Sequence, residues 1–216
     1  MTSRTPETSQ RQNILDAATA VFSEQGINGA RIEHIARKAG VNKALVYYYF
    51  GSKQELYKNA IKNQFQELFD ELKSYFEQES FTDTNSVDFL KQFVRIHFKV
   101  VTKRFPHARF LIGALVDEPK TVQTIIRDMA GDDGHALPKL LLGVIEGGIA
   151  RGELRPVNPK QLIISMLGMN LIYFIAKPIA EVFMALNVED EELFLEERLT
   201  SVLDLLLYGI VERRPS

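Results

Sequence analysis

The segment Phe22–Lys53 reads FSEQGINGARIEHIARKAGVNKALVYYYFGSK, and its pattern decides the fold of the N-terminal part of the chain. Apolar residues at helical spacing predict a helix, a tight turn and a second short helix. Ala36 is small enough for the two helices to cross closely, and Gly40 permits the sharp turn between them. This pattern is typical of a helix-turn-helix, whose second helix fits the major groove of DNA.

The second helix of the pair is expected to begin after Asn42, which caps it, and to end near Tyr49 or Phe50. The residues that anchor it to the first helix are Val41 and either Leu45 or Val46. This packing leaves the following side chains on display: Asn42, Lys43, Ala44, Tyr47 and Tyr48. A lysine and neighbouring phenols suit contacts with phosphate oxygens and base edges. Lys53 opens the next helix, where its charge adds to free backbone N–H groups and predicts a second phosphate contact.

An alternative interpretation makes the tyrosines at 47–49 simply part of the core and of the helix end. Each helical residue rotates by about 100°, so one face cannot bury three consecutive side chains, and at least one ring should be exposed. The charge distribution also favours DNA. Residues 1–55 carry seven basic and five acidic side chains, so this segment is +2, and the remainder must be −4 to give the total of −2. A basic head on an acidic body fits a DNA-binding end.

In order and spacing, these elements resemble the N-terminal domain of the TetR family of bacterial regulators. The matching elements are Phe22 with Gly26, Ile35-Ala36 with Ala39-Gly40-Val41, and Val46-Tyr47-Tyr48-Tyr49-Phe50 with Ser52-Lys53. The rest of the chain agrees with the family only in helical architecture and length. The resemblance implies DNA contacts at Lys43, Ala44, Leu45, Tyr47, Tyr48 and Lys53.

The chain departs from the family pattern at two places. The family often has a threonine where Ala30 or Arg31 stands, and Arg31 is expected to replace that hydroxyl with charge at the phosphate. Many members carry glycine and threonine at the positions of Ala44 and Leu45. An apolar pair there is expected to favour contact with thymine methyl groups over hydrogen bonding.

The rest of the chain also shows helical periodicity, and no convincing strand pattern is found. Gly26 is placed to end the first helix. Further helices are expected at about residues 30–39, 52–79, 87–103, 136–150, 158–186 and 189–211, with a shorter one between Pro106 and Pro119 and a turn at Gly131–Gly134. We therefore predict an all-α protein. Residues 1–51 form a three-helix DNA-binding domain, and residues 52–216 form a larger helical ligand-binding and dimerisation domain.

Several classes of protein are disfavoured by the composition. The chain has no cysteine, which excludes disulfides and cysteine-ligated zinc. Its four histidines form no recognised ligand spacing, and no nucleophile or phosphate-loop motif is present, so we expect no enzyme, metal site or cofactor. Residues 1–12 lack the apolar stretch of a signal peptide. The longest apolar run, residues 162–176, is shorter than the ~20 residues needed to span a bilayer, so we expect a buried core helix, no membrane partner and a cytoplasmic location.

The last two expected helices are unusually apolar, and a helix apolar on most sides must be buried on several of them. Core plus dimer interface is the favoured explanation, and a thick monomer core is the alternative. The resemblance implies that these helices form a four-helix bundle with a second copy. The expected interface residues are Leu167, Gly168, Leu171, Leu199, Val202, Leu206 and Ile210. Such a homodimer would hold two recognition helices about 34 Å apart, which suits a pseudo-palindromic operator in double-stranded DNA.

Aromatic and isolated polar side chains gather in the middle and late helices. They suit either an ordinary core or an apolar cavity with a few polar anchors. The resemblance implies a small-molecule pocket in this region, and the candidate lining is Phe93, His97, Phe98, Phe110, Asn170 and Tyr173. We therefore expect a DNA-binding repressor that a small apolar or amphipathic effector releases from its operator. The alternative is a helical scaffold or interaction protein that does not bind DNA.

Overall fold

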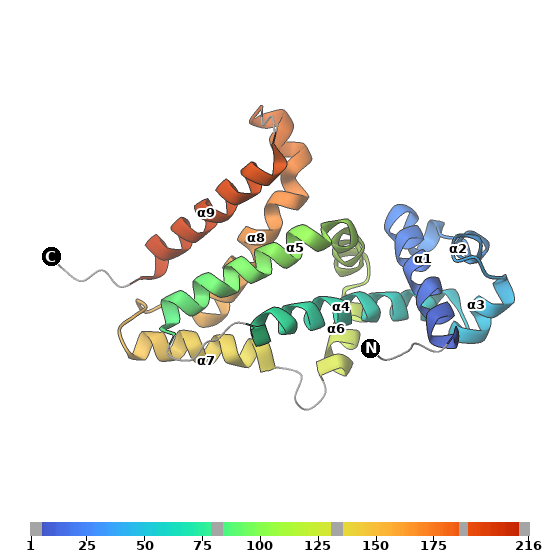
Figure 1. Ribbon diagram of the computed structural model, residues 1–216, viewed down its shortest axis with the longest axis horizontal. Coiled ribbons are helices and arrows are strands. Elements are labelled where there is room, and N and C mark those ends of the chain that lie inside the picture. Colours follow the sequence, from blue (N-terminus) through green and yellow to red (C-terminus); the bar gives the residue numbers. More distant parts are fainter. Residues whose placement is uncertain (1–5, 79–83, 131–135, 186–189, 212–216) are drawn as a thin grey trace. The chain divides into compact units, whose positions relative to one another are not determined.

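The computed structural model describes residues 6–78, 84–130, 136–185 and 190–211, and within these ranges the chain is helical apart from short connections (Figure 1). The extended pairing found among them is one isolated antiparallel bridge between Leu154 and Val211. The predicted all-α class is confirmed. The predicted turn at 131–134 lies outside the described residues.

The helices divide between two compact units, Met1–Asp70 with Arg104–Gly134 and Glu71–Lys103 with His135–Ser216. Two long helices, α4 (Lys53–Gln78) and α5 (Ser86–Asp117), each contribute residues to both units. The predicted division at residue 51 stays a prediction.

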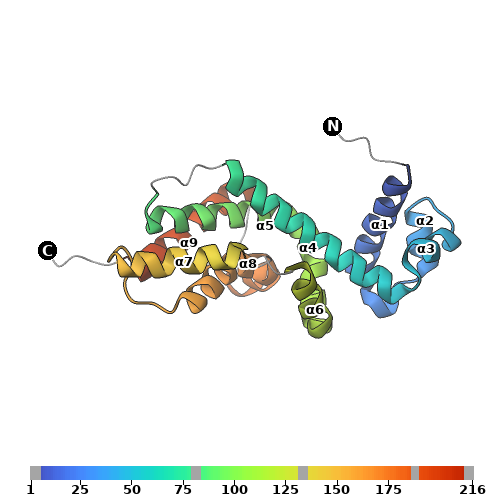
Figure 2. The same cartoon turned by 90° about the horizontal axis from the view of Figure 1, so that it is seen from below.

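The first unit is built on a helical head that comprises α1 (Pro6–Gly29), α2 (Ile32–Lys38) and α3 (Lys43–Phe50) (Figure 2). Gly26 has a φ of 64°, so it breaks the helical geometry of α1 at the predicted place. The first half of α4, the end of α5 and α6 (Pro119–Ala130) complete the core of this unit. An aromatic cluster joins three of these helices, because Phe22 and Phe110 each contact Tyr57 edge to face at 5.0 and 5.6 Å.

Helix α5 is longer than predicted, because it continues through Pro106 to Asp117. We expected a break at this proline. An internal proline removes one backbone hydrogen bond and costs about 3 kcal/mol, which packing on both sides can offset. Phe93 and Val94 before the proline are buried in the second core, and Phe110 and Ala114 after it are buried in the first. The predicted short helix between Pro106 and Pro119 is therefore the second half of α5.

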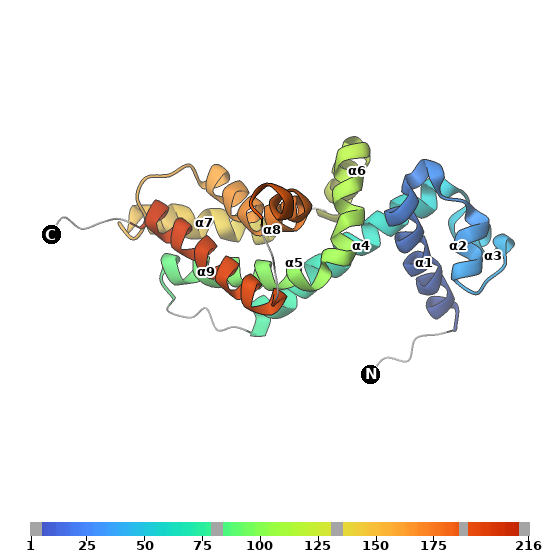
Figure 3. The same ribbon diagram turned by 90° about the horizontal axis from the view of Figure 1, so that it is seen from above.

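The second unit packs the first half of α5 with α7 (Ala136–Ala150), α8 (Pro159–Phe183) and α9 (Glu191–Ile210) (Figure 3). Both α8 and α9 begin with an N-cap. The side-chain carbonyl of Asn158 accepts from the backbone N–H groups of Lys160 and Gln161, and the Asp190 carboxylate accepts from the backbone N–H of Leu193. A polar cluster joins α5 to the end of α7. The Ser86 backbone N–H donates to Glu153 at 2.7 Å, and the Arg151 guanidinium donates to both Glu153 and the Ser86 hydroxyl.

Helix α8 is not the fully buried core helix that we expected. By length and composition it is long and apolar enough to cross a membrane, and 28% of its most apolar 18-residue window is buried. Leu162, Met166, Asn170 and Tyr173 face the core of their own unit, while Ile164, Ile172 and Ile179 are exposed. Periodicity measures how apolar a helix is, but it does not say how much of its surface the same chain covers.

Candidate nucleic-acid interface and ligand-binding region

The turn between α2 and α3 has the geometry that its sequence predicts. Gly40 adopts a φ of 69°, a left-handed conformation that side chains disfavour. The Val41 N–H donates to the Ala36 carbonyl at 3.0 Å, which closes the turn. The Asn42 side chain then accepts from the Leu45 N–H at 2.8 Å and caps α3. These short-range bonds fix where α3 starts.

Helix α3 has one buried side and one exposed side. Val46 and Phe50 are buried in the first core, so Val46 rather than the half-buried Leu45 is the main anchor. Tyr48 is 78% exposed and Tyr47 is 41% exposed, whereas Tyr49 is partly buried. The prediction that at least one ring of the tyrosine run is exposed is confirmed. Asn42, Lys43 and Ala44 are exposed as well.

Two lysines of the candidate interface already contact neighbouring groups. The Lys43 ammonium donates to the Glu33 carboxylate of α2, and it lies 5.7 Å from the centre of the Tyr47 ring. The Lys53 ammonium donates to the Ala30 carbonyl at 3.2 Å. Arg31, the N-cap residue of α2, is exposed.

Two head residues were not singled out from the sequence. Glu33 is one, because its contact with Lys43 depends on how α2 and α3 cross. Arg11 is the other: its guanidinium lies 5.1 Å from the centre of the Phe50 ring and donates to Asn59 at 2.9 Å. Both contacts join residues on different helices, and no local sequence pattern predicts them.

The head matches known proteins in both sequence and fold. Residues 14–60 match the sequence model of the family described as "Bacterial regulatory proteins, tetR family". The chain is 28% identical over 206 residues to the HTH-type transcriptional regulator RutR of Escherichia coli strain K12, covering 94% of this chain and 92% of that protein. These matches confirm the predicted resemblance of the chain to the TetR family.

Two further comparisons extend the similarity, one in sequence and one in fold. The HTH-type transcriptional repressor NicS of Pseudomonas putida strain KT2440 is 47% identical over 53 residues, which are 24% of this chain and 25% of NicS. The fold is similar to that of AibR, solved in complex with isovaleryl coenzyme A and operator DNA, with a TM-score of 0.66 and 20% identity over 91% of this chain and 97% of AibR.

Five of the six candidate ligand-lining residues lie in the second unit. Asn170 of α8 is fully buried, and its amide donates to the Val94 carbonyl at 3.0 Å and meets His97 Nδ1 at 2.9 Å. Burial lowers the pKa of His97 to about 4, so the imidazole is neutral at pH 7. Its Nδ1 therefore accepts the proton of the amide. The buried side-chain carbonyl of Asn170 and the buried hydroxyl of Tyr173 have no hydrogen-bond partner among the described residues.

Aromatic rings enclose this polar group, which is consistent with either a core or a ligand-binding region. Phe93 stacks on His97 with ring centres 6.0 Å apart, and the ring centres of Phe98 and Phe174 are 6.1 Å apart. Tyr173 lies 5.0 Å from Phe194 of α9. The structure does not bring Phe110 together with these residues, because Phe110 is part of the first core and packs on Phe22 and Tyr57.

The structure corrects several of the residues chosen for the dimer interface. Val202, Leu206 and Ile210 are buried in the core of their own unit, so they present almost no surface to a second copy. Leu167 and Leu199 pack partly against the same core. Gly168 is exposed and Leu171 is partly exposed, so both remain candidates.

The exposed apolar side of α8 and α9 is made of other residues. On α8 these are Ile164, Ile172, Ile175, Ile179, Val182 and Phe183, and on α9 they are Leu193, Leu205 and Tyr208. Gly168 falls within the stripe on α8 at helical spacing. We call these nine side chains the α8–α9 apolar face.

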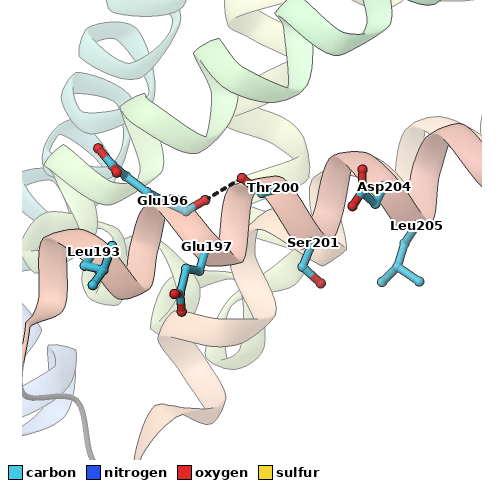
Figure 4. A pocket seen from close by; sticks show the side chains of 7 residues that line it. All are labelled: Leu193, Glu196, Glu197, Thr200, Ser201, Asp204 and Leu205. Carbon is cyan, nitrogen blue, oxygen red and sulfur yellow. Dashed lines mark hydrogen bonds between the residues drawn. The ribbon is translucent and has the colours of Figure 1, made fainter.

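A surface depression follows α9 on the same side (Figure 4). Its lining is Leu193, Glu196, Glu197, Thr200, Ser201, Asp204 and Leu205, and it includes none of the candidate ligand-binding residues. Within the described ranges, the structure has no group of three or more histidine, aspartate or glutamate side chains able to hold a metal ion.

Proposed function

We propose that this protein is a transcriptional repressor of the TetR family that binds a pseudo-palindromic operator through α3. The observation that carries the proposal is the two-sided character of α3. Val46 and Phe50 hold it from behind, and Lys43, Tyr47 and Tyr48 are exposed on the opposite side, where they can reach a DNA groove. The proposed DNA contacts are Arg31, Asn42, Lys43, Ala44, Leu45, Tyr47, Tyr48 and Lys53. RutR and NicS, which are similar in sequence, are named as a transcriptional regulator and a transcriptional repressor.

The repressor acts as a homodimer in this proposal. The α8–α9 apolar face leaves nine large apolar side chains exposed, and large exposed apolar patches mark interaction surfaces. A second copy related by two-fold symmetry would cover it with the same face. The dimer would hold two α3 helices at the spacing of successive major grooves. A membrane is the alternative partner for the α8–α9 apolar face. Sedimentation in detergent-free buffer that shows only monomer at micromolar protein concentration would count against the dimer.

A small effector relieves repression by shifting the population of conformations. Phe93, His97, Phe98, Asn170 and Tyr173 are the proposed binding region, because this part of the second unit has buried polar atoms with no hydrogen-bond partner among the described residues. AibR was solved with both a ligand and operator DNA. Helix α4 begins in the first unit and ends in the second, so it is the expected lever. We propose no catalytic role.

A gel-shift experiment tests the DNA-binding proposal. Duplex DNA from upstream of the protein's own gene is titrated at two salt concentrations with the wild type, Lys43→Gln and Tyr48→Ala. Because each phosphate contact releases about one counterion, Lys43→Gln should weaken operator binding and lower the salt slope by roughly 0.9. Lys139→Gln, an exposed lysine of α7 in the second unit, makes the same charge change and should bind as the wild type does.

The same experiment separates the repressor from a helical scaffold. If Lys43→Gln and Tyr48→Ala bind every duplex as tightly as the wild type, α3 does not contact DNA. Unshifted DNA with all proteins, at both salt concentrations and with sites selected from random sequence, would favour the scaffold alternative.

A further inference from the structure

The first turn of α3 carries a positive charge at a helix end that is already positive. Lys43 is the first residue of α3, and the first turn of this helix contains no acidic side chain. The partial charge of a helix N-terminus disfavours a cation there and favours an anion. The carboxylate that supplies the anion comes from a different helix, since Glu33 lies in the first turn of α2.

Glu33 and Lys43 form a specific contact across the helix-turn-helix. The Lys43 ammonium donates to Glu33 Oε1, and the same ammonium lies over the Tyr47 ring. The hydrogen bond to Lys43 lowers the pKa of Glu33, and the hydrogen bond to Glu33 raises the pKa of Lys43, so both groups are charged at neutral pH. Both side chains are at least half exposed, so a phosphate oxygen of DNA has access to the same ammonium.

We propose that Glu33 is a specificity-determining residue, which occupies the Lys43 ammonium in place of a DNA phosphate until the operator is recognised. This inference rests on the proposed function. Binding to random DNA depends almost wholly on the neutralisation of phosphates by basic side chains. While Glu33 is paired with the Lys43 ammonium, random binding lacks the contribution of that ammonium. Operator binding also gains base contacts, and an exposed ion pair is weak enough for these to displace. Glu33 therefore lowers random binding more than operator binding.

The charge change predicts a measurable effect on random DNA. Glu33→Gln frees one ammonium, which adds about one phosphate contact to the random complex. The salt slope for a random duplex should steepen by roughly 0.9, which is about an 8-fold gain in affinity at 0.1 M salt. Operator affinity should rise by less, so the ratio of operator to random affinity falls several-fold.

Glu24→Gln is the matched control for this experiment. Glu24 also pairs with a lysine, because its Oε1 lies 3.6 Å from Nζ of Lys38 in α2. Its substitution makes the same change in net charge within the head. Binding of a selected operator and of a random duplex of equal length is measured over a range of salt for both variants. The double variant Glu33→Gln, Lys43→Gln should bind random DNA as Lys43→Gln alone does, because Glu33 acts through Lys43.

The outcomes distinguish this inference from the proposed function. An unchanged salt slope in Glu33→Gln, or an equal gain in Glu24→Gln, would overturn the role of Glu33 while leaving operator binding intact. A gain in Glu33→Gln that persists without Lys43 would also overturn it. A wild-type protein that binds no DNA would instead refute the proposed function itself.

Discussion

Replacing Gly148 by alanine should destabilise the second unit, although alanine is the better helix former. Gly148 is buried on α7, and a Cβ added there would lie 2.6 Å from the Ser86 side chain and 2.9 Å from Leu154 Cδ1. Contacts this short require movement. Ser86 cannot move freely, because its hydroxyl donates to the Val144 carbonyl at 3.0 Å and accepts from Arg151 at 2.7 Å.

The size of the effect follows from two opposing terms. Overpacking a tight core costs about 1–3 kcal/mol. Alanine in place of glycine in a helix returns roughly 0.8–1.0 kcal/mol. Gly148→Ala should therefore lose up to about 2 kcal/mol in the free energy of unfolding. For a protein of this size, this loss corresponds to a fall in Tm of up to roughly 8 °C.

Gly143→Ala in the same helix provides the matched control. Gly143 is exposed, and nothing lies within 4 Å of its added Cβ, so only the helix-propensity term applies and the variant should be stabilised by up to about 1 kcal/mol. Urea unfolding at one fixed protein concentration gives the midpoint and the slope for both variants. If Gly148→Ala proves as stable as Gly143→Ala, the close packing of α7 against Ser86 is not as described.

Two further predictions concern the second unit. Hydrogen bonds from Arg151 and from the Ser86 backbone N–H lower the pKa of Glu153 from 4.5 to about 2, so the stability that Glu153 contributes is fully present above pH 4.5 and is lost as the pH falls towards 2. Glu153→Gln should therefore be less stable than the wild type at pH 7 in urea unfolding, and a stability gap that stays constant down to pH 2 would contradict the assignment. Leu206 is buried in its own core and Leu205 is 62% exposed on the α8–α9 apolar face, so Leu206→Ala should lose about 2–5 kcal/mol of stability. Leu205→Ala should instead promote dissociation of the dimer in sedimentation experiments. A dimer that dissociates in Leu206→Ala but not in Leu205→Ala, with the loss of stability in Leu205→Ala, would contradict these positions.

The aromatic cluster in the first unit gives Phe110 a structural role that the sequence did not reveal. Its ring contacts Phe22 of α1 and Tyr57 of α4, and Tyr57 is itself buried. Burial raises the pKa of the Tyr57 hydroxyl, and the nearby Asp117 and Glu118 raise it further. The end of α5 is therefore packed directly against the helix that precedes the DNA-binding pair.

Predictions from the sequence succeeded where the determining contacts are close together in the chain. The turn at Gly40 and the cap at Asn42 lie within a few residues, so their pattern is readable without any tertiary information, whereas packing decided that Val46 rather than Leu45 is the anchor. Helix α7 runs from Ala136 to Ala150 as predicted, because its ends are also local features. Helical rotation alone predicted that at least one ring of the tyrosine run is exposed, and the structure shows that Tyr48 is the most exposed of them.

Tertiary structure decided the features that join distant segments. Apolar periodicity marks Val202 and Ile164 equally as members of an apolar helix, yet Val202 faces its own core and Ile164 faces outward. The continuation of α5 past Pro106 depends on two separate cores that offset the lost hydrogen bond. The sequence alone therefore determined where α3 begins and that it has an exposed side, since turn and cap chemistry act over a few residues. The crossing of α2 and α3 decided that Lys43 meets Glu33, because this contact exists only once both helices are packed.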